Sequence, residues 1–277
     1  MSTPRPIVTI DDPDDPRLAD FRALIDADVR PDRRGIVIAE GVNVVDRLLR
    51  SPYRARAILG VPGKLAALAP TLTAAPDVAV YEVDKWLLSD VVGFRVTRGV
   101  LASADRPAPV SPASVVGGGG RFVVLEGLND FENLGSLFRN AAAFGLNGVL
   151  LDRRCADPLY RRSVRVSMGH VFSMPFAVLD DPWPQSMSVF AEADVPVLAM
   201  TPRAAAGSVF EADVRASWAV LLGAEGPGLS EQALAAASEW RRIPMSDGVD
   251  SLNVATAGAV AFAALSVGRV FGEPNAG

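Results

Sequence analysis

The chain has very little cysteine, histidine and lysine, and each shortage excludes a kind of chemistry. Cys155 is the only cysteine in 277 residues, so no internal disulfide can form and we expect a cytoplasmic protein. His170 is the only histidine, which leaves no histidine cluster for a metal and no paired histidine for acid–base catalysis. We therefore expect no metal. Lys64 and Lys85 are the only lysines, so arginine carries nearly all of the positive charge.

Secretory and membrane signals are also missing. The first thirty residues are rich in aspartate and show no apolar segment flanked by basic residues, so we expect no secretory signal. The longest near-apolar run, residues 254–268, is too short and too rich in Gly, Ser and Thr for a membrane span. The net charge of −5 argues against broad adhesion to nucleic acid, although a local basic face stays possible.

A linker-like stretch divides the chain. Residues 106–120 combine proline and serine with four consecutive glycines, a composition typical of linkers. We predict a first domain over residues 1–105, this linker, and a second domain over 121–277. In the first domain, apolar runs predict strands and helical patterns alternate with them, which indicates a small α/β domain. The strands are expected at 35–39 and 57–60, and the helices at 42–49 and 83–91.

The second domain contains continuous apolar runs, which suit parallel strands that are buried on both faces. Helical patterns separate these runs, so we predict an α/β domain with a mostly parallel sheet and helices on both faces. The expected strands are 122–125, 148–151, 196–200 and 218–222. The expected helices are 134–144, 158–167, 183–193, 230–238 and 252–270.

Three segments of this domain carry polar residues at the starts of helices. In the first, Asn133 is expected to cap a helix that Gly145 ends, with Arg139 inside it. Arg139 is either a functional residue or an ordinary surface arginine. In the second, a strand enters three glycines around Glu225; ligands bind at such ends of open α/β sheets. The spacing fits neither a dinucleotide fingerprint nor a phosphate loop.

The third segment, residues 241–265, is a polar loop that turns into a long helix of small residues. Ser251 is expected to cap this helix, with Asp250 and Asn253 beside it. The start of such a helix offers several free backbone N–H groups to a ligand. The acidic Glu225 of the second segment would suit a cationic or hydroxyl-bearing ligand better than a bare phosphate.

Taken in order, the three segments resemble a known family. Asn133-Leu-Gly-x-x-x-Arg139, Gly223-x-Glu-Gly-x-Gly228 and Ile243-Pro-Met-x7-Asn253-Val are similar to the motifs of the TrmH/SpoU family. Its members are S-adenosylmethionine-dependent RNA 2′-O-ribose methyltransferases of the knotted SPOUT class. The first domain, through residues 34–43, resembles the small ribosomal-protein-like domain that recognises RNA in many members.

The resemblance implies a fold, a cofactor and a partner. The C-terminal helix would thread an earlier loop to form a trefoil knot, an exception to ordinary chain topology. The protein would form a homodimer through the knot region and bind S-adenosylmethionine. The cofactor-binding residues would be Gly223, Ile243 and Leu252, mostly through their backbone, with Met200, Thr201, Ala224, Glu225, Gly226 and Met245 as neighbours.

The resemblance also implies the catalytic residues. Arg139 stays protonated and is a poor base, so we expect it to grip an RNA phosphate and stabilise the developing alkoxide. Asn133, Ser251 and Asn253 would orient the ribose, the arginine or the loop, and Glu225 would hold Arg139 or accept the proton. Ala255 stands where the family usually has a serine, so no role for that hydroxyl carries over.

Arginines suggest where RNA could bind. A group after the second predicted strand of the second domain fits phosphate contacts. The alternative is a solvated face whose arginines pair with acids elsewhere. This group comprises Arg153, Arg154, Arg161, Arg162 and Arg165. Arg30, Arg33 and Arg34, with Arg54 and Arg56, form a weaker patch in the first domain. Cys155, beside two arginines, is either a reactive thiol or a buried inert one.

The main hypothesis is an RNA 2′-O-ribose methyltransferase that acts on rRNA. One alternative is a tRNA-directed member of the family. Another is an RNA-binding or ribosome-assembly factor that kept the fold and lost catalysis. The target nucleotide is not readable from the sequence.

Overall fold

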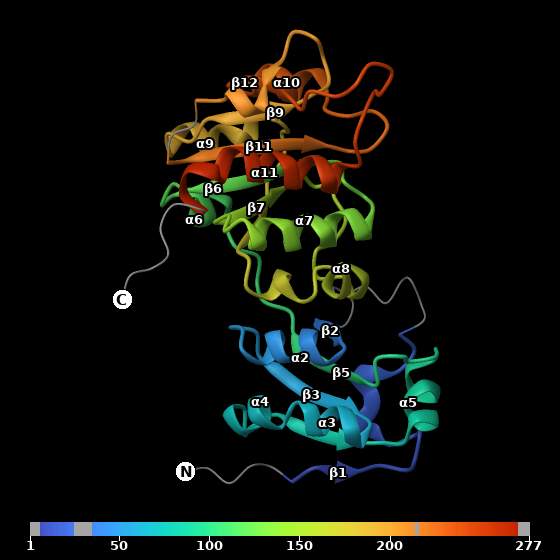
Figure 1. Cartoon of the computed structure of the whole chain (residues 1–277). Coiled ribbons are helices and arrows are strands. Elements are labelled where there is room, and N and C mark those ends of the chain that lie inside the picture. The colour runs from blue at the N-terminus through green and yellow to red at the C-terminus, as the bar shows by residue number, and fades with distance from the viewer. Residues whose placement is uncertain (1–5, 25–34, 214–215, 271–277) are drawn as a thin grey trace. The chain divides into compact units, whose positions relative to one another are not determined.

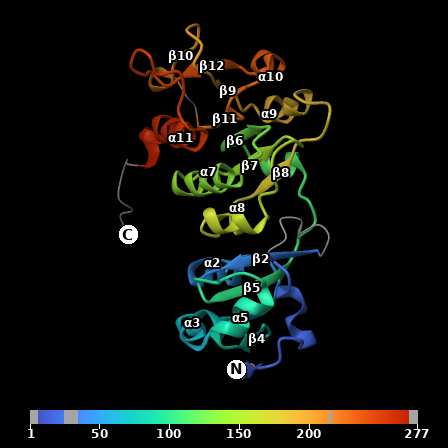
Figure 2. The same ribbon diagram turned by 90° about the vertical axis from the view of Figure 1, so that its right-hand side faces the viewer.

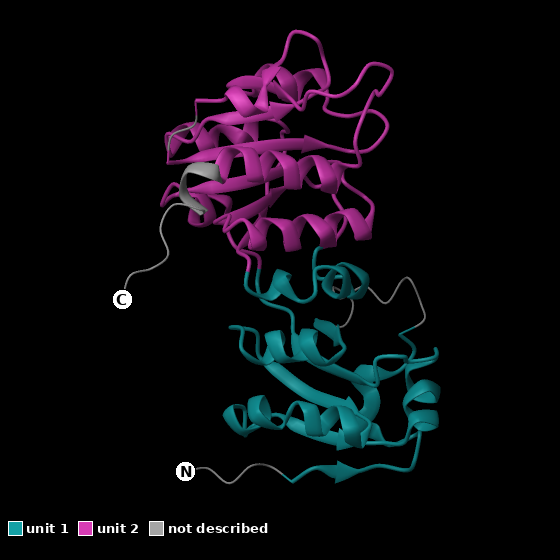
Figure 3. Cartoon of the chain, in the orientation of Figure 1, with its two compact units in different colours: residues 1–108, 158–173 teal, residues 109–157, 174–277 magenta. Residues whose placement is uncertain are grey.

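The computed structural model describes residues 6–24, 35–213 and 216–270 of the chain (Figure 1). By their contacts, the residues form two compact units, which Figure 3 shows in different colours. The first unit is 1–108 with 158–173, and the second is 109–157 with 174–277. Residues 158–173, which we expected within the second domain, thus pack with the first unit.

The first unit is a five-stranded α/β sheet in the order β1-β4-β3-β5-β2. β5 runs antiparallel to both of its neighbours, while β1, β4 and β3 are parallel. The strands are β1 Val8–Thr9, β2 Ile36–Glu40, β3 Ala55–Gly60, β4 Ala79–Glu82 and β5 Val100–Asp105. The helices are η1 Pro16–Phe21, α2 Val42–Leu49, α3 Pro62–Ala67, α4 Ala69–Ala74, α5 Lys85–Val92, α8 Arg161–Val166 and η2 His170–Phe172.

The second unit contains a seven-stranded sheet in the order β10-β12-β9-β11-β6-β7-β8. All of its neighbouring pairs are parallel, so the prediction of a mostly parallel sheet is confirmed. The strands are β6 Arg121–Glu126, β7 Gly148–Leu151, β8 Phe176–Val178, β9 Val197–Met200, β10 Gly207–Ser208, β11 Trp218–Gly223 and β12 Glu239–Arg242.

Helices cover both faces of this sheet (Figures 1 and 2). On one face, α7 Phe131–Ala143 and α11 Val254–Val270 pack against each other and α11 contacts β11. On the other face, Phe122 and Val124 of β6 share a hydrophobic core with Phe190 and Leu234. Phe190 lies on α9 Ser188–Glu192, and Leu234 lies on α10 Glu231–Ala236. The helices α6 Pro112–Val116 and η3 Gln185–Met187 also contribute to this core. Both faces are buried, which explains the continuous apolar runs.

The helix starts differ from the predicted ones. α7 begins at Phe131 because Asp130 accepts hydrogen bonds from the backbone of Glu132 and Asn133, so Asp130 is the cap and Asn133 lies inside the first turn. The predicted end is confirmed, since Gly145 takes a left-handed conformation just after the helix. Among the described residues, no helix combines the length and the apolar character needed to cross a bilayer.

Candidate active site

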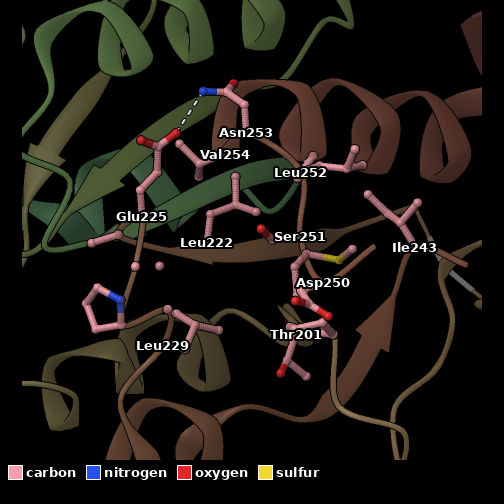
Figure 4. Close-up of a pocket in the computed structure, with 18 of the residues that line it drawn as sticks. Thr201, Leu222, Glu225, Leu229, Ile243, Asp250, Ser251, Leu252, Asn253 and Val254 are labelled. Carbon is pink, nitrogen blue, oxygen red and sulfur yellow. Dashed lines mark hydrogen bonds between the residues drawn. The ribbon is translucent and has the colours of Figure 1, made fainter. Parts of the chain in front are cut away.

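A cavity of about 670 Å³ opens at the carboxyl ends of β9, β11 and β12 (Figure 4). This volume is within the range of about 300–1,000 Å³ that small-molecule sites occupy. Its wall contains every residue that the resemblance assigned to the cofactor: Met200, Thr201, Gly223, Ala224, Glu225, Gly226, Ile243, Met245 and Leu252. Ser251 and Asn253 line it as well. Segments that lie apart in the sequence therefore meet around one space.

Gly223 is required by a close approach of backbone to backbone. A Cβ at this position would lie 2.4 Å from the carbonyl carbon of Gly228 and 2.5 Å from the nitrogen of Leu229. The turn between them is closed by the Gly228 N–H, which donates to the Ala224 carbonyl at 3.0 Å. Gly226 has a φ of +87° within it. The turn can therefore close only with glycine at its first position, and it carries Glu225 into the cavity wall.

Asn253 joins the three motifs. Its Nδ2 donates to Asn133 Oδ1 and to Glu225 Oε1, both at 2.8 Å. Its Oδ1 accepts from the backbone N–H of Ala255 at 3.0 Å and of Thr256 at 3.2 Å. Asn253, and not Ser251 as predicted, therefore caps α11. Ser251 lies three residues before the helix begins.

A second link between α7 and α11 was missed by the sequence reasoning. Asn140 Nδ2 donates to the Ala255 carbonyl at 2.9 Å. Asn140 follows Asn133 by seven residues, which is close to two helical turns and places both amides on one face of α7. That spacing was the signal in the sequence that could have found it. The two asparagines fix the first turn of α11 against α7.

Arg139 occupies a different place from the other motif residues. Its side chain is exposed on α7 and does not line the cavity. Within the described part of the chain it has no hydrogen bond or ion pair. Among the described residues, no hydrogen bond or ion pair joins Glu225 to Arg139, and Glu225 Oε1 accepts a hydrogen bond from Asn253. Arg139 is therefore free to bind a ligand outside the cavity.

The charged residues of the cavity wall are Glu225, Asp250 and Arg203. Arg203 is occupied: both of its terminal nitrogens contact the Glu231 carboxylate, one of them at 3.1 Å, and its guanidinium lies 5.4 Å from the centre of the Trp240 ring. The hydrogen bond between the two raises the pKa of Arg203 and lowers the pKa of Glu231. Since Glu231 cancels this cation, the wall is acidic on balance.

Comparison with known proteins gives the family. The model of the SpoU rRNA Methylase family matches residues 120–263. An uncharacterized tRNA/rRNA methyltransferase of Mycobacterium tuberculosis is 48% identical over 257 residues, which cover 91% of this chain and 88% of that protein. The chain belongs to the SpoU rRNA methylase family. This SpoU protein is thus an RNA methyltransferase by family, and the family uses S-adenosylmethionine.

Other relatives agree with this assignment. The 23S rRNA (guanosine-2′-O-)-methyltransferase RlmB of Bordetella pertussis is 34% identical over 146 residues, covering 53% of this chain and 59% of RlmB. The crystal structure of an AdoMet-bound rRNA methyltransferase from Sinorhizobium meliloti superposes with a TM-score of 0.80. It covers 95% of this chain and 99% of its own, with 24% sequence identity, and shows that the SpoU protein shares its fold.

Three of the five arginines in the group that follows β7 are paired with carboxylates. Arg153 Nη2 lies 2.7 Å from Asp180. Arg154 lies 3.0 Å from Glu126 and 2.8 Å from Asp152. These pairs, all in the second unit, reduce the charge that the SpoU protein offers to RNA there and match the alternative of a face paired with acids.

The remaining arginines of that group belong to the first unit. Arg161 Nη1 lies 3.0 Å from the buried Glu40, and its guanidinium stacks 4.4 Å from the centre of the Phe94 ring. Arg162 and Arg165 are on the same helix. Arg33 and Arg34 lie outside the described residues.

Cys155 and His170 take no part in the cavity of the SpoU protein. The Cys155 thiol donates to the Leu125 carbonyl and accepts from the Leu128 N–H, both at 3.3 Å. Burial raises the pKa of this thiol far above its usual range. Of the two alternatives, a reactive thiol or a buried inert one, the structure therefore supports the inert thiol. His170 begins the short η2 turn of the first unit. Among the described residues, no group of three or more His, Cys, Asp and Glu side chains is arranged to hold a metal.

Proposed function

We propose that this protein transfers a methyl group from S-adenosylmethionine to a ribose 2′-hydroxyl in RNA, with rRNA as its substrate in preference to tRNA. The observation that carries the proposal is the cavity lined by the second and third family motifs, to which Asn253 joins the first motif through its hydrogen bonds to Glu225 and Asn133. Its acidic wall suits a cationic cofactor. The ribose target and rRNA are supported by the family description and by the name of the RlmB relative.

The cofactor would be held chiefly by backbone. Gly223, Ile243 and Leu252 come from three segments around the cavity, and their N–H and C=O groups can bind an adenine and a sugar edge. The apolar side chains of Met200, Met245 and Leu252 offer contact surface for the adenosine. Thr201, Ala224, Glu225 and Gly226 complete the site. When bound, S-adenosylmethionine supplies an activated methyl group on a sulfonium.

The reaction is an in-line displacement, in which a bond forms from the ribose oxygen to the methyl carbon while the carbon–sulfur bond breaks. The electron pair stays on sulfur, and the hydroxyl proton must leave. Arg139 would grip an RNA phosphate and stabilise the developing alkoxide. Glu225 Oε1 is bound by Asn253, so its other oxygen is the candidate proton acceptor. Asn133 and Asn253 would act as positioning residues, and Ser251 would orient the loop or the ribose.

The architecture and assembly of the family extend the proposal. We infer a trefoil knot in which α11 threads through an earlier loop, and a homodimer through this region that needs no metal. Residues 1–105 would be a ribosomal-protein-like RNA-recognition domain, 106–120 a linker, and 121–277 the methyltransferase domain. The protein would act in the cytoplasm. RNA contacts would come from Arg153, Arg154, Arg161, Arg162 and Arg165, with Arg33 and Arg34. RNA phosphates would have to displace the carboxylates that now contact Arg153, Arg154 and Arg161.

Two measurements test the proposal. Isothermal calorimetry should detect binding of S-adenosylmethionine, and its absence would favour a silent RNA-binding or assembly factor. Mapping of 2′-O-methylation in rRNA and tRNA from a deletion strain should then show one lost site in rRNA; a lost site in tRNA would support the tRNA alternative.

The role of Arg139 has its own test. With the RNA so identified, Arg139→Ala should lower kcat by about 100-fold or more, as the loss of an oxyanion contact does, and Arg139→Lys should recover part of that loss. Near-wild-type turnover in both variants would show that Arg139 has no catalytic role.

A further inference from the structure

The cavity wall carries more negative than positive charge. This balance depends on the ion pair between Arg203, which lines the cavity, and Glu231, which does not. Glu225 and Asp250 come from different loops and lie on different sides of the cavity (Figure 4). Within the described part of the chain, Asp250 has no hydrogen bond or ion pair. Glu225 is bound only through Oε1, by a neutral amide. Neither carboxylate is thus neutralised by a cation among the described residues.

Among the described residues of the wall, Arg203 is the one cation, and its charge is opposed by a carboxylate from outside the wall. Arg203 lines the cavity, whereas its partner Glu231 is on α10 and does not. The contact between them is bidentate, and the Trp240 ring supports the guanidinium. Bidentate carboxylate pairs fix an arginine in place and reduce its field. The electric field on a ligand in the cavity therefore comes mainly from the carboxylates of Glu225 and Asp250.

We infer that this charge balance lets the site distinguish the methyl donor from the spent product. The inference rests on the proposed function, in which the donor carries a sulfonium and the product, S-adenosylhomocysteine, carries a neutral thioether. The two ligands share adenosine, ammonium and carboxylate groups and differ only in the methyl group and its charge. An acidic wall therefore binds the donor more tightly than the product. Its affinity for the bound ligand falls when methyl transfer removes the positive charge. Asp250 and the Arg203–Glu231 pair thus become specificity-determining residues that favour product release.

Three variants test the inference by calorimetry on the full-length protein with S-adenosylmethionine and S-adenosylhomocysteine. A carboxylate a few ångströms from a unit charge in water contributes on the order of five-fold in affinity. Asp250→Asn should therefore weaken binding of the donor by about this factor and leave the product nearly unchanged. Glu231→Gln should act in the same direction, since it exposes the Arg203 charge without altering the cavity wall. Sinefungin, a cationic amine analogue, should follow the donor.

Asp247 provides the matched control. It is an exposed acid of the same loop that does not line the cavity, so Asp247→Asn should leave the ratio of the two dissociation constants unchanged. In the wild-type protein, added salt should weaken binding of the donor more than binding of the product. This measurement needs no variant, so it tests the inference even if a variant fails to fold.

The outcomes separate the inference from the function on which it rests. If Asp250→Asn and Glu231→Gln weaken donor and product equally, or change neither, the charge-selection inference is overturned while the methyltransferase proposal stands. If the wild-type protein binds neither ligand, the proposed function itself fails.

Discussion

At the scale of single residues, Asn253 decides how the site is held together. All of its side-chain hydrogen-bonding groups are used within the protein: the amide nitrogen binds Asn133 and Glu225, and the oxygen caps α11. A side chain so occupied has little capacity left for a substrate. Its contribution is to fix the positions of other groups.

Two substitutions separate the two ends of the Asn253 side chain. Asn253→Asp keeps an oxygen that can cap α11 but places a carboxylate against Glu225. We expect nearly unchanged thermal stability, because the helix cap remains. We expect at least ten-fold weaker cofactor binding, because the turn that carries Glu225 loses its hydrogen bond to Asn253 and is no longer held in position. Asn253→Ala should also lose the cap, at a cost of about 1 kcal/mol. Equal cofactor affinity in wild type and Asn253→Asp, measured by calorimetry, would contradict this role.

Gly223 gives a second prediction at the same scale. A methyl group there would enter the backbone of Gly228 and Leu229, which no side-chain rotation can relieve. Gly223→Ala should therefore displace the Glu225 turn and weaken cofactor binding by about ten-fold or more, a cost of over 1 kcal/mol. Gly118→Ala is the control, because nothing lies within 4 Å of its added Cβ. Similar calorimetric affinities for the two variants would show that the turn tolerates a side chain.

At the scale of elements, α8 is attached to β2 by one buried ion pair. Arg161 and Glu40 are 121 positions apart in sequence, and the carboxylate is only 4% exposed. The backbone carbonyl of Leu24 and the Phe94 ring surround the same guanidinium. Burial of this kind makes removal of one partner costly, since the other charge stays behind without compensation.

Glu40→Gln should consequently destabilise the protein by about 2–3 kcal/mol, somewhat below the cost of a fully buried pair because Arg161 is partly exposed. Arg54→Ala, which removes an exposed ion pair with Asp105, should change stability by about 0–1 kcal/mol. Urea unfolding of both variants measures the difference. A loss for Glu40→Gln no larger than for Arg54→Ala would show that the pair does not fix α8.

Element boundaries were predicted best where a hydrophobic pattern is clear, as an amphipathic period in α2 or a continuous apolar run in β7. The helix at 42–49 and the strand at 148–151 agree with α2 and β7 to the residue. β12 was missed because Glu239-Trp-Arg-Arg242 looks like a polar surface segment, and it pairs with β9 and β10 despite its charge. Local pattern does not reveal a strand whose pairing depends on distant partners.

At the scale of the whole molecule, the proposed homodimer would need an apolar surface near α11. Phe210 is 61% exposed on η4, Val209–Glu211, and η4 contacts α11. Phe210→Glu should shift the protein from dimer towards monomer in light-scattering measurements, because burying a charge at an interface is costly. Trp86→Glu is the control: this side chain is 85% exposed in the first unit. A mass unchanged by Phe210→Glu would place any interface elsewhere.

The α/β class, the parallel sheet of the second unit, the SpoU family and the segments that line the cavity were all predictable from the chain, because hydrophobic periodicity and motif residues can be recognised without knowledge of any tertiary contact. The tertiary structure decided what depends on distant contacts. It grouped residues 158–173 with the first unit, and it gave the capping of α11 to Asn253. It also paired arginines that look free in the sequence, including Arg154 and Arg203. Pairing and capping are set by which groups meet in space, and the chain order does not contain that information.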